Sequence, residues 1–145
     1  MFQHLLLAID DSELAGKALA QGLALAKQLK AKVTIVTVTK PWPAAPYGTM
    51  PTPSLIDIYA KTSAESAAHL LSAATTAAEK ASVACATLCI KDQYPAEGII
   101  AAAEDHACDL IVMASHGRGA LGRLLLGSET LKVVTLSPVP VFICR

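Results

Sequence analysis

The chain has 145 residues, of which 53% are hydrophobic and 17% are charged, and its formal net charge at pH 7 is zero. This length favours one domain with a hydrophobic core of its own. The neutral balance of charge argues against a general electrostatic attraction to nucleic acid or to an anionic membrane. No segment approaches the roughly 18 apolar residues of a membrane-spanning helix. We therefore expect neither nucleic acid nor a membrane as a partner.

The N-terminus and the cysteines predict a cytoplasmic protein. The segment "MFQHLLLAIDDSE" has no basic region before its apolar run, and the run meets two aspartates instead of a cleavage site. No CxxC pair occurs, and no ligand spacing supports a zinc site. In a reducing cytoplasm we expect the cysteines to be free thiols. They are Cys85, Cys89, Cys108 and Cys144.

The first half of the chain alternates between strand and helix patterns. The apolar run His4–Ile9 predicts a buried strand, and apolar residues at helical spacing predict a helix over Ser12–Lys30. The β-branched residues of Lys32–Val38 predict a second strand. Five prolines and a glycine make Lys40–Pro53 a loop. The alanine-rich stretch Ser54–Ala81 predicts a long helix with Ser54 as its cap.

The second half continues the alternation. We expect a strand over Val83–Ile90, a helix over Tyr94–Ala107 and a strand over Asp109–Ala114. After a glycine-rich loop, Ser128–Ser137 predicts a short helix and Val139–Cys144 a fifth strand. Strands that alternate with helices, each strand an almost unbroken apolar run, predict an α/β fold. Its parallel sheet has helices on both faces, and residues 1–145 form a single domain.

The segment "GRGALG" (117–122) matches G-x-G-x-x-G, the glycine pattern of dinucleotide-binding folds. That fingerprint also needs an acidic residue about 20 positions on, at the end of the next strand. No acidic residue occurs after Glu129, and the motif follows the fourth strand instead of the first. The segment also lacks the lysine and the Ser/Thr of a Walker A loop. We therefore do not expect binding of NAD or FAD.

A second spacing in the same loop suits a mononucleotide. Gly117, nine further residues, Gly127 and then Ser128 read G-x9-G-S and lead into the last helix. The first turn of a helix offers free N–H donors and the positive end of the dipole, a ready site for phosphate. The Ser128 hydroxyl can add a hydrogen bond. This spacing predicts a phosphate-binding loop.

Ligands of open α/β sheets bind beyond the carboxyl ends of the strands. Asp10 follows the first predicted strand, and Val38 ends the second. Asp11 and Ser12 can both cap the next helix, which leaves Asp10 for contact with a ligand. The alternative is that Asp10 is itself a loop aspartate or a helix cap.

Over essentially its full length the chain resembles the universal stress protein family. The resemblance lies in "LLLAIDDSELA", "VTIVTVTK", "DLIVMASHGRGALGRLLLGSETLKVV" and "SPVPVFICR". It implies a Rossmann-like three-layer α/β/α sandwich with five parallel strands in the order 3-2-1-4-5. It also implies homodimers, a stress-response or signalling role, and binding of ATP, with or without magnesium, in the ATP-binding branch of the family.

The resemblance carries binding roles over by position. It implies that the nucleotide meets Asp10 near the end of the first strand and that the adenine meets the main chain of Val38. The implied contacts to ribose and phosphates are Gly117, Gly127, Ser128 and the main chain of Glu129.

The chain departs from the family's G-x2-G-x9-G-(S/T) pattern at one position. In this register the residues are Ala114, Gly117, Gly127 and Ser128, so Ala114 replaces the first glycine. Its methyl group is tolerated if the backbone there has a negative φ, because only a positive φ favours glycine. We expect the site to be weakened and not abolished.

Two other functions stay open: a dimeric interaction protein that binds no nucleotide, and a slow ATP hydrolase. The sequence has no Walker lysine, no evident general base and no acidic metal cluster, so we assign no catalytic residue and no metal ligand. Pro140 cannot donate to a strand ladder and predicts that the last strand lies at an edge of the sheet. An apolar edge invites pairing with a second copy, so we expect a homodimer through this strand.

Overall fold

The structure of the chain, a computed structural model, describes residues 1–42, 52–116 and 125–145. Within these ranges five strands and four helices alternate, as predicted. The strands are β1 (His4–Ala8), β2 (Lys32–Val38), β3 (Cys85–Ile90), β4 (Leu110–Ala114) and β5 (Val141–Cys144). The helices are α1 (Glu13–Leu29), α2 (Pro53–Ala81), α3 (Pro95–Asp105) and α4 (Ser128–Leu136).

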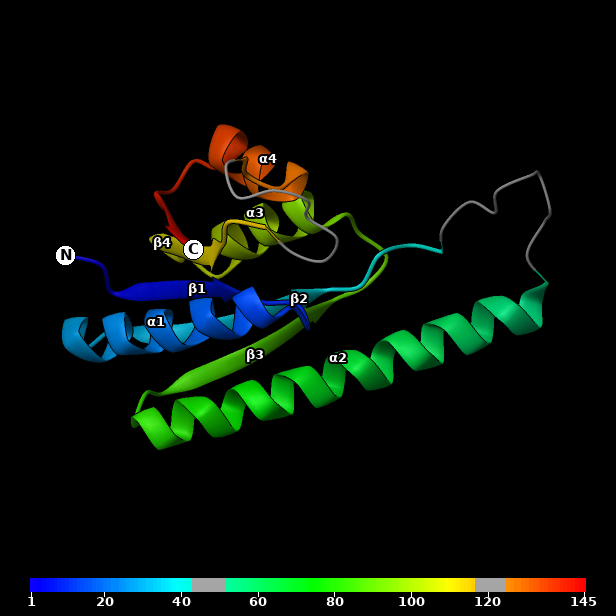
Figure 1. The fold of residues 1–145 in the computed structure, drawn as a ribbon, viewed down its shortest axis with the longest axis horizontal. Coiled ribbons are helices and arrows are strands. Elements are labelled where there is room, and N and C mark those ends of the chain that lie inside the picture. The colour runs from blue at the N-terminus through cyan, green and yellow to red at the C-terminus, as the bar shows by residue number, and fades with distance from the viewer. Residues whose placement is uncertain (43–51, 117–124) are drawn as a thin grey trace.

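The five strands form one parallel sheet in the order β3-β2-β1-β4-β5, which confirms the predicted strand order. Helices α1 and α2 pack on one face, and α3 and α4 pack on the other (Figure 1). The strand order reverses between β1 and β4, which are neighbours in the sheet. This reversal marks the place where open α/β sheets bind ligands.

Two hydrophobic clusters fill the space between the sheet and its helices. The cluster beneath α1 and α2 includes Leu5 and Val112, and the cluster beneath α3 and α4 includes Leu6, Ile111 and Val133. Each of these five side chains is at most 1% exposed. Strands β1 and β4 therefore bury side chains on both faces, which explains their unbroken apolar sequences. Strand β3, at the edge of the sheet, is only partly covered.

The start of α2 differs from the prediction, and Ser54 as its cap is wrong. The helix begins at Pro53, and the Thr52 hydroxyl oxygen accepts a hydrogen bond from the Leu55 N–H at 3.3 Å. A proline suits the first helical position, because its fixed φ is already helical and its missing N–H has no partner to lose there.

Strands β3 and β5 each begin two residues later than predicted. The Val83 N–H donates to the carbonyl of Ala78 at the end of α2, at 3.0 Å. The Val139 N–H donates to the hydroxyl of Ser137 at 3.2 Å. Both N–H groups bond to residues at the end of the preceding helix and are not available to a neighbouring strand. Strand pairing therefore begins only at Cys85 and Val141.

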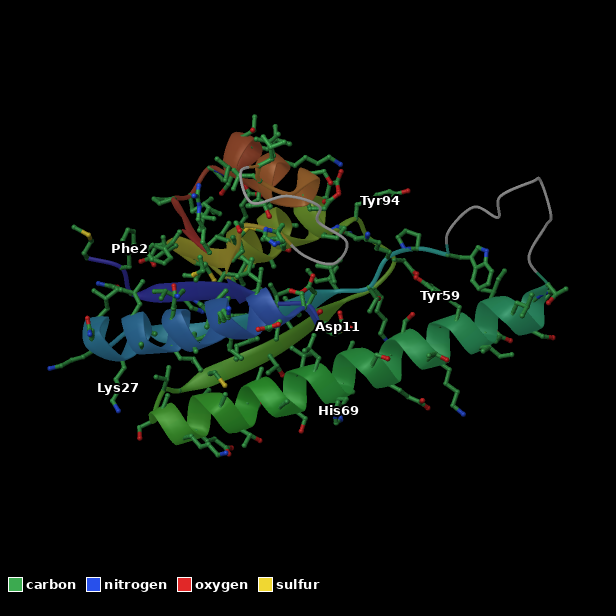
Figure 2. The ribbon with its side chains drawn as sticks, viewed as in Figure 1. Phe2, Asp11, Lys27, Tyr59, His69 and Tyr94 are labelled. Atoms are coloured by element: carbon green, nitrogen blue, oxygen red, sulfur yellow. The ribbon has the colours of Figure 1, made fainter. Side chains whose placement is uncertain are left out.

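Helix α2 extends past the end of the sheet at its N-terminal side (Figure 1). Its buried residues begin only at Ala67. Closer to its start, the Tyr59 hydroxyl donates to the Lys40 carbonyl at 3.0 Å, and the Tyr59 ring meets Trp42 edge-on at 5.1 Å between centroids. Figure 2 shows Tyr59 directed toward the segment that leaves β2. In the described ranges, every helix is too short or too polar to span a membrane.

The Asp109 carboxylate lies at the amino edge of the sheet, where the strands begin, and links the start of β4 to the start of β1. Its two oxygens accept hydrogen bonds from the main-chain N–H groups of Gln3 and His4, at 2.8 and 3.0 Å. Burial acts to raise the pKa of this carboxyl, but hydrogen bonds from the main chain of Gln3, His4 and Asp109 itself, together with the charge of His4, hold the pKa below its ordinary value. Asp109 thus holds β1 in place beside β4.

His4 lies buried at the same edge. Its Nε2 is 2.8 Å from the Thr34 hydroxyl oxygen, and its Nδ1 has no hydrogen-bond partner in the described part of the chain. Burial lowers the pKa of this ring below 6.5, and the charge of Lys32 lowers it further. The charge of Asp109 and the main chain of His106 act in the opposite direction without reversing the shift. The folded protein therefore favours neutral His4.

The four cysteines are free thiols, as expected. Cys108 and Cys144 are buried, and Cys85 and Cys89 are half-buried. Burial raises the pKa of the Cys108 thiol to about 11 and also raises the pKa values of Cys85 and Cys144. Thiols with a raised pKa stay protonated at neutral pH and are poor nucleophiles.

Candidate functional site

The predicted binding residues that the structure describes all lie at the carboxyl edge of the sheet. Asp10 follows β1, Val38 ends β2 and Ala114 ends β4. Residues 127–129 form the cap and the start of α4. Gly117 lies outside the described residues.

Asp10 takes part in the turn that leads into α1. Its Oδ1 accepts a hydrogen bond from the Ser12 N–H at 2.9 Å, and the Ser12 hydroxyl oxygen accepts from the Ala15 N–H at 3.1 Å. Ser12 is therefore the cap of α1, as expected, but it does not leave Asp10 without a structural role. An aspartate that bonds the N–H two residues on is a common way to start a turn.

The side chain of Val38 packs against α3, in the cluster beneath α3 and α4. A Cβ atom added to Gly98 of α3 would lie 2.9 Å from Val38 Cγ2, so the valine side chain packs tightly on that helix. After Val38 the chain stays in the sheet for one more hydrogen bond, because the Thr39 N–H donates to the Ile90 carbonyl at 2.8 Å.

Ala114 points away from α4. Its side chain is 7% exposed and belongs to the cluster beneath α1 and α2, on the opposite face of the sheet. It is not among the described non-glycine residues with a positive φ. Its carbonyl accepts a hydrogen bond from the Thr130 hydroxyl at 3.1 Å. The methyl group that distinguishes Ala114 from glycine therefore neither strains the backbone nor reaches the start of α4.

Gly127 holds the start of α4 against the end of β4. Its N–H donates to the Ser115 carbonyl at 2.8 Å. Its φ is −59°, which any residue can adopt. The position nevertheless favours glycine, because an added Cβ would lie 3.2 Å from both Cα and Cβ of His116. A side chain here would therefore require His116 to move by a few tenths of an ångström, and the crowding comes from the close approach of the chain and not from an unusual φ.

Three helices begin at this edge, and their first turns differ. Helix α1 has a side-chain acceptor in Ser12, whose oxygen takes the Ala15 N–H. Helix α3 takes its acceptor from α4, because Glu129 Oε2 accepts from the Ala96 N–H at 2.8 Å. Helix α4 starts at Gly127, which has no side chain to offer. Helix α2 has the Thr52 hydroxyl as its acceptor. Among the helices in the described residues, α4 therefore differs in having no side-chain acceptor for the N–H groups of its first turn.

The side chains around the start of α4 suit an anion better than a metal ion. Ser128 is exposed, and the Glu129 carboxylate is turned toward α3. Lys132 Nζ lies 3.4 Å from Glu129 Oε1 and offsets part of its charge. His116 Nδ1 is 3.1 Å from the Ser115 hydroxyl oxygen, so it takes part in local hydrogen bonding. The described ranges hold no group of three or more His, Cys, Asp or Glu side chains that could bind a metal.

Sequence reasoning missed two side chains that shape this edge. Thr130 ties the first turn of α4 to β4, and Glu129, expected to contribute only its main chain, caps α3. Thr130 is buried, which is unusual for a polar residue, but its sequence position alone did not indicate this. The Glu129 contact joins residues 33 positions apart, and no local pattern predicts it.

The whole chain, residues 1–145, matches the model of the universal stress protein family. The universal stress protein YxiE of Bacillus subtilis (strain 168) is 33% identical over 152 residues, which cover 100% of both chains. A universal stress protein of Thermus aquaticus, named for the QAH/OAS sulfhydrylase 3' region, is 51% identical over 51 residues. That match covers 35% of this chain and 37% of the Thermus protein.

Solved structures of the family share the fold. The universal stress protein UspA from Lactobacillus plantarum has a TM-score of 0.82 at 24% identity and covers 99% of this chain and 98% of its own. A universal stress protein in complex with cAMP has a TM-score of 0.74 at 20% identity, with 99% and 97% covered. An Arabidopsis thaliana family protein with AMP bound has a TM-score of 0.69 at 14% identity, with 97% and 90% covered. This chain belongs to the universal stress protein family.

Proposed function

We propose that residues 1–145 form one nucleotide-binding domain that holds an adenine nucleotide at the carboxyl edge of the sheet and acts as a stress-response module. The observation that carries the proposal is the start of α4. Its first turn has no side-chain acceptor within the described residues, and it follows the point where the strand order reverses. A phosphate group satisfies such N–H donors and interacts favourably with the helix dipole.

Known relatives support adenine as the base. One structural neighbour has cAMP bound and another has AMP bound. In this chain the adenine would meet the main chain of Val38, since its side chain is packed on α3. The choice of ATP, and of magnesium as its companion, rests on the family resemblance.

The proposed contacts divide by chemistry. Gly127 and Ser128 bring main-chain donors and a hydroxyl to the phosphates, and the Glu129 N–H lies in the same helical turn. Asp10 contributes a half-buried carboxylate beside β1, suited to a ribose hydroxyl. Gly117 would complete the G-x9-G-S loop. The orientation of the Ala114 methyl, away from α4, supports binding despite the missing glycine.

The experiment is to denature the purified protein, identify any released nucleotide, and titrate the folded chain with AMP, ADP and ATP, with and without magnesium. We expect an adenine nucleotide in the released material, or a dissociation constant below the millimolar range. Absence of both contradicts the proposed function. A time course with ATP tests the slow hydrolase in the same samples, and we expect no sustained turnover.

A homodimer through β5 is the second part of the proposal. β5 lies at the edge of the sheet, and Phe142 on it is 44% exposed. On the neighbouring α4, Leu131 and Leu136 are 54% and 65% exposed. Exposed apolar side chains beside an open strand edge favour pairing with a second copy.

Analytical ultracentrifugation at micromolar concentration tests the dimer. We expect a dimer for the wild type and a monomer for Phe142→Glu, because the charge would be buried in the interface. Leu55→Glu is the matched control, since Leu55 is 48% exposed on α2, far from β5 in sequence. A wild type that sediments as a monomer contradicts this part and leaves nucleotide binding to its own test.

A further inference from the structure

Helix α3 begins without a cap of its own. Its N-cap residue Tyr94 makes no side-chain capping bond, and Pro95 at the first helical position has no N–H. The Gly98 N–H is already bonded to the Tyr94 carbonyl at 3.0 Å. The Ala96 N–H therefore depends on an acceptor from elsewhere in the fold, and Glu129 of α4 supplies it.

Glu129 joins two helices with one carboxylate. Its Oε2 accepts from the Ala96 N–H at 2.8 Å, and its Oε1 lies 3.4 Å from Lys132 Nζ. Two further hydrogen bonds fix the same turn to the end of β4 and the residue after it: the Thr130 hydroxyl donates to the Ala114 carbonyl, and the Gly127 N–H donates to the Ser115 carbonyl. Among these bonds only the one from Glu129 reaches a different helix.

The direction of the Glu129 side chain matters for an anionic ligand. A carboxylate in the first turn of α4, turned toward its N-terminus, would repel a phosphate held by the same turn. Here the charge is directed to the N-terminus of α3 and is offset by that helix and by Lys132. The carboxylate occupies the N-terminus of α3, where an anion would otherwise be favoured. A phosphate is therefore expected at the N-terminus of α4, whose first-turn N–H groups have no side-chain acceptor in the described residues.

We propose that Glu129 is a positioning residue of the phosphate site, an inference that rests on the proposed function. Its side chain does not touch the ligand. Through its bond to the Ala96 N–H it fixes the first turn of α4, so that the N–H groups of Ser128 and Thr130 are held ready for phosphate. The alternative is that Glu129 only caps α3 and stabilises the fold.

Four variants separate positioning from stability. Glu129→Ala removes the bond, Glu129→Asp keeps the charge but shortens its reach, and Glu129→Gln keeps an oxygen acceptor without the charge. Val133→Ala is the matched control, because it weakens the packing of α4 and does not involve the Ala96 N–H. AMP and adenosine are titrated by calorimetry at a temperature where every variant is folded. Adenosine lacks the phosphate and reports on the rest of the site.

We expect Glu129→Ala and Glu129→Asp to bind AMP about five- to tenfold more weakly than the wild type, as for the loss of one hydrogen bond. Their affinity for adenosine should stay within about twofold, a change too small to reflect a lost contact. Glu129→Gln and Val133→Ala should bind AMP as the wild type does. If Glu129→Ala does not fold, the comparison of Glu129→Asp with Glu129→Gln decides in the same way.

Two results overturn the inference alone: wild-type AMP affinity in Glu129→Ala and Glu129→Asp, or an equal loss for AMP and adenosine that Val133→Ala shares. The second result assigns Glu129 a purely structural role. A wild type that binds neither AMP nor ATP overturns the proposed function and this inference with it, so the two failures are told apart by the first titration.

Discussion

The two edges of the sheet use their polar groups in different ways. At the amino edge, the Asp109 carboxylate takes the N–H groups of Gln3 and His4, and His4 in turn meets Thr34. At the carboxyl edge, side chains cap α1 and α3, but α4 begins at Gly127 without a cap in the described ranges. At the amino edge the main-chain donors at the start of β1 are satisfied by a side chain, whereas within the described residues the first turn of α4 has no side-chain acceptor.

We expect the amino edge to contribute mainly to the stability of the fold and the start of α4 to contribute mainly to ligand binding. Substitutions at the amino edge should change the free energy of unfolding and leave ligand affinity alone. Substitutions at the start of α4 should change affinity more than stability. Each prediction below tests one side of this separation, beginning with the largest expected effect.

Asp109→Ala should lower the free energy of unfolding by about 2–4 kcal/mol, because it removes two hydrogen bonds to a charged acceptor. Urea denaturation measures the loss. Affinity for AMP, measured on the folded fraction, should stay within about twofold, a difference too small to indicate a lost contact. A clear fall in affinity would show that the two edges are coupled.

Gly127→Val should weaken AMP binding by about tenfold or more, a loss of about 1.4 kcal/mol in binding free energy. The added side chain must push His116 and the first turn of α4 apart, since even a Cβ atom lies 3.2 Å from the His116 backbone. Calorimetric titration measures this effect.

Gly16→Ala is the matched control for that substitution. A Cβ atom at Gly16 on α1 meets nothing within 4 Å. The control should raise stability by about 0.5–1 kcal/mol, because alanine favours the helix, and should leave affinity unchanged. Unchanged affinity in Gly127→Val as well would place the phosphate elsewhere.

His4→Gln should remove a pH dependence of stability. The folded-state pKa of His4 lies below 6.5, so the unfolded chain binds more protons between the two pKa values. Stability is therefore fully present above pH 6.5 and falls as the pH drops through the folded-state pKa. The groups that face this ring are Lys32, Asp109 and His106.

Urea denaturation between pH 7.5 and 5 measures this fall, a window above the titration of Asp109, whose pKa lies below 3.8. Glutamine keeps a hydrogen bond to Thr34 but does not titrate, so its curve should be flatter. His69→Gln, on the exposed side of α2 (Figure 2), should keep the wild-type slope. Equal slopes in all three proteins would mean that His4 is not the titrating group.

Lys17→Ala should change stability by at most about 0.5 kcal/mol, the smallest effect of the series. Lys17 Nζ lies 3.9 Å from Glu13 Oε1, and both side chains are well exposed, at 61% and 91%. Thermal unfolding in low and high salt measures the effect. A larger loss would show that this exposed ion pair contributes more to the free energy of unfolding than surface pairs usually do.

Much of the fold could be predicted from the sequence because strands buried on both faces leave an unbroken apolar run. The predicted second strand, Lys32–Val38, matches β2 to the residue. The ends of other elements could not be predicted from the sequence, because each end depends on which acceptor a single main-chain N–H group finds in the folded chain. The Val83 N–H, for example, serves the end of α2 instead of the sheet.

The candidate site was predictable in position but not in its physical basis. The G-x9-G-S spacing indicated Gly127, and the structure shows that a Cβ atom there would crowd His116, whereas the φ of Gly127 is one that any residue can adopt. The sequence did not indicate which face of the sheet the Ala114 methyl occupies, and the structure places it beneath α1 and α2, away from α4. The Glu129 contact to Ala96 depends on the packing of two helices far apart in sequence.

The most direct test of the central claim is an NMR titration of the labelled chain with AMP, which follows each main-chain amide. We predict that the largest shifts occur at Ser128, Glu129 and Thr130, the first turn of α4. The capped amides of Ala15 and Ala96, and those at the amino edge, should move little. Largest shifts at Ala15 or Ala96, with α4 unmoved, would contradict the account.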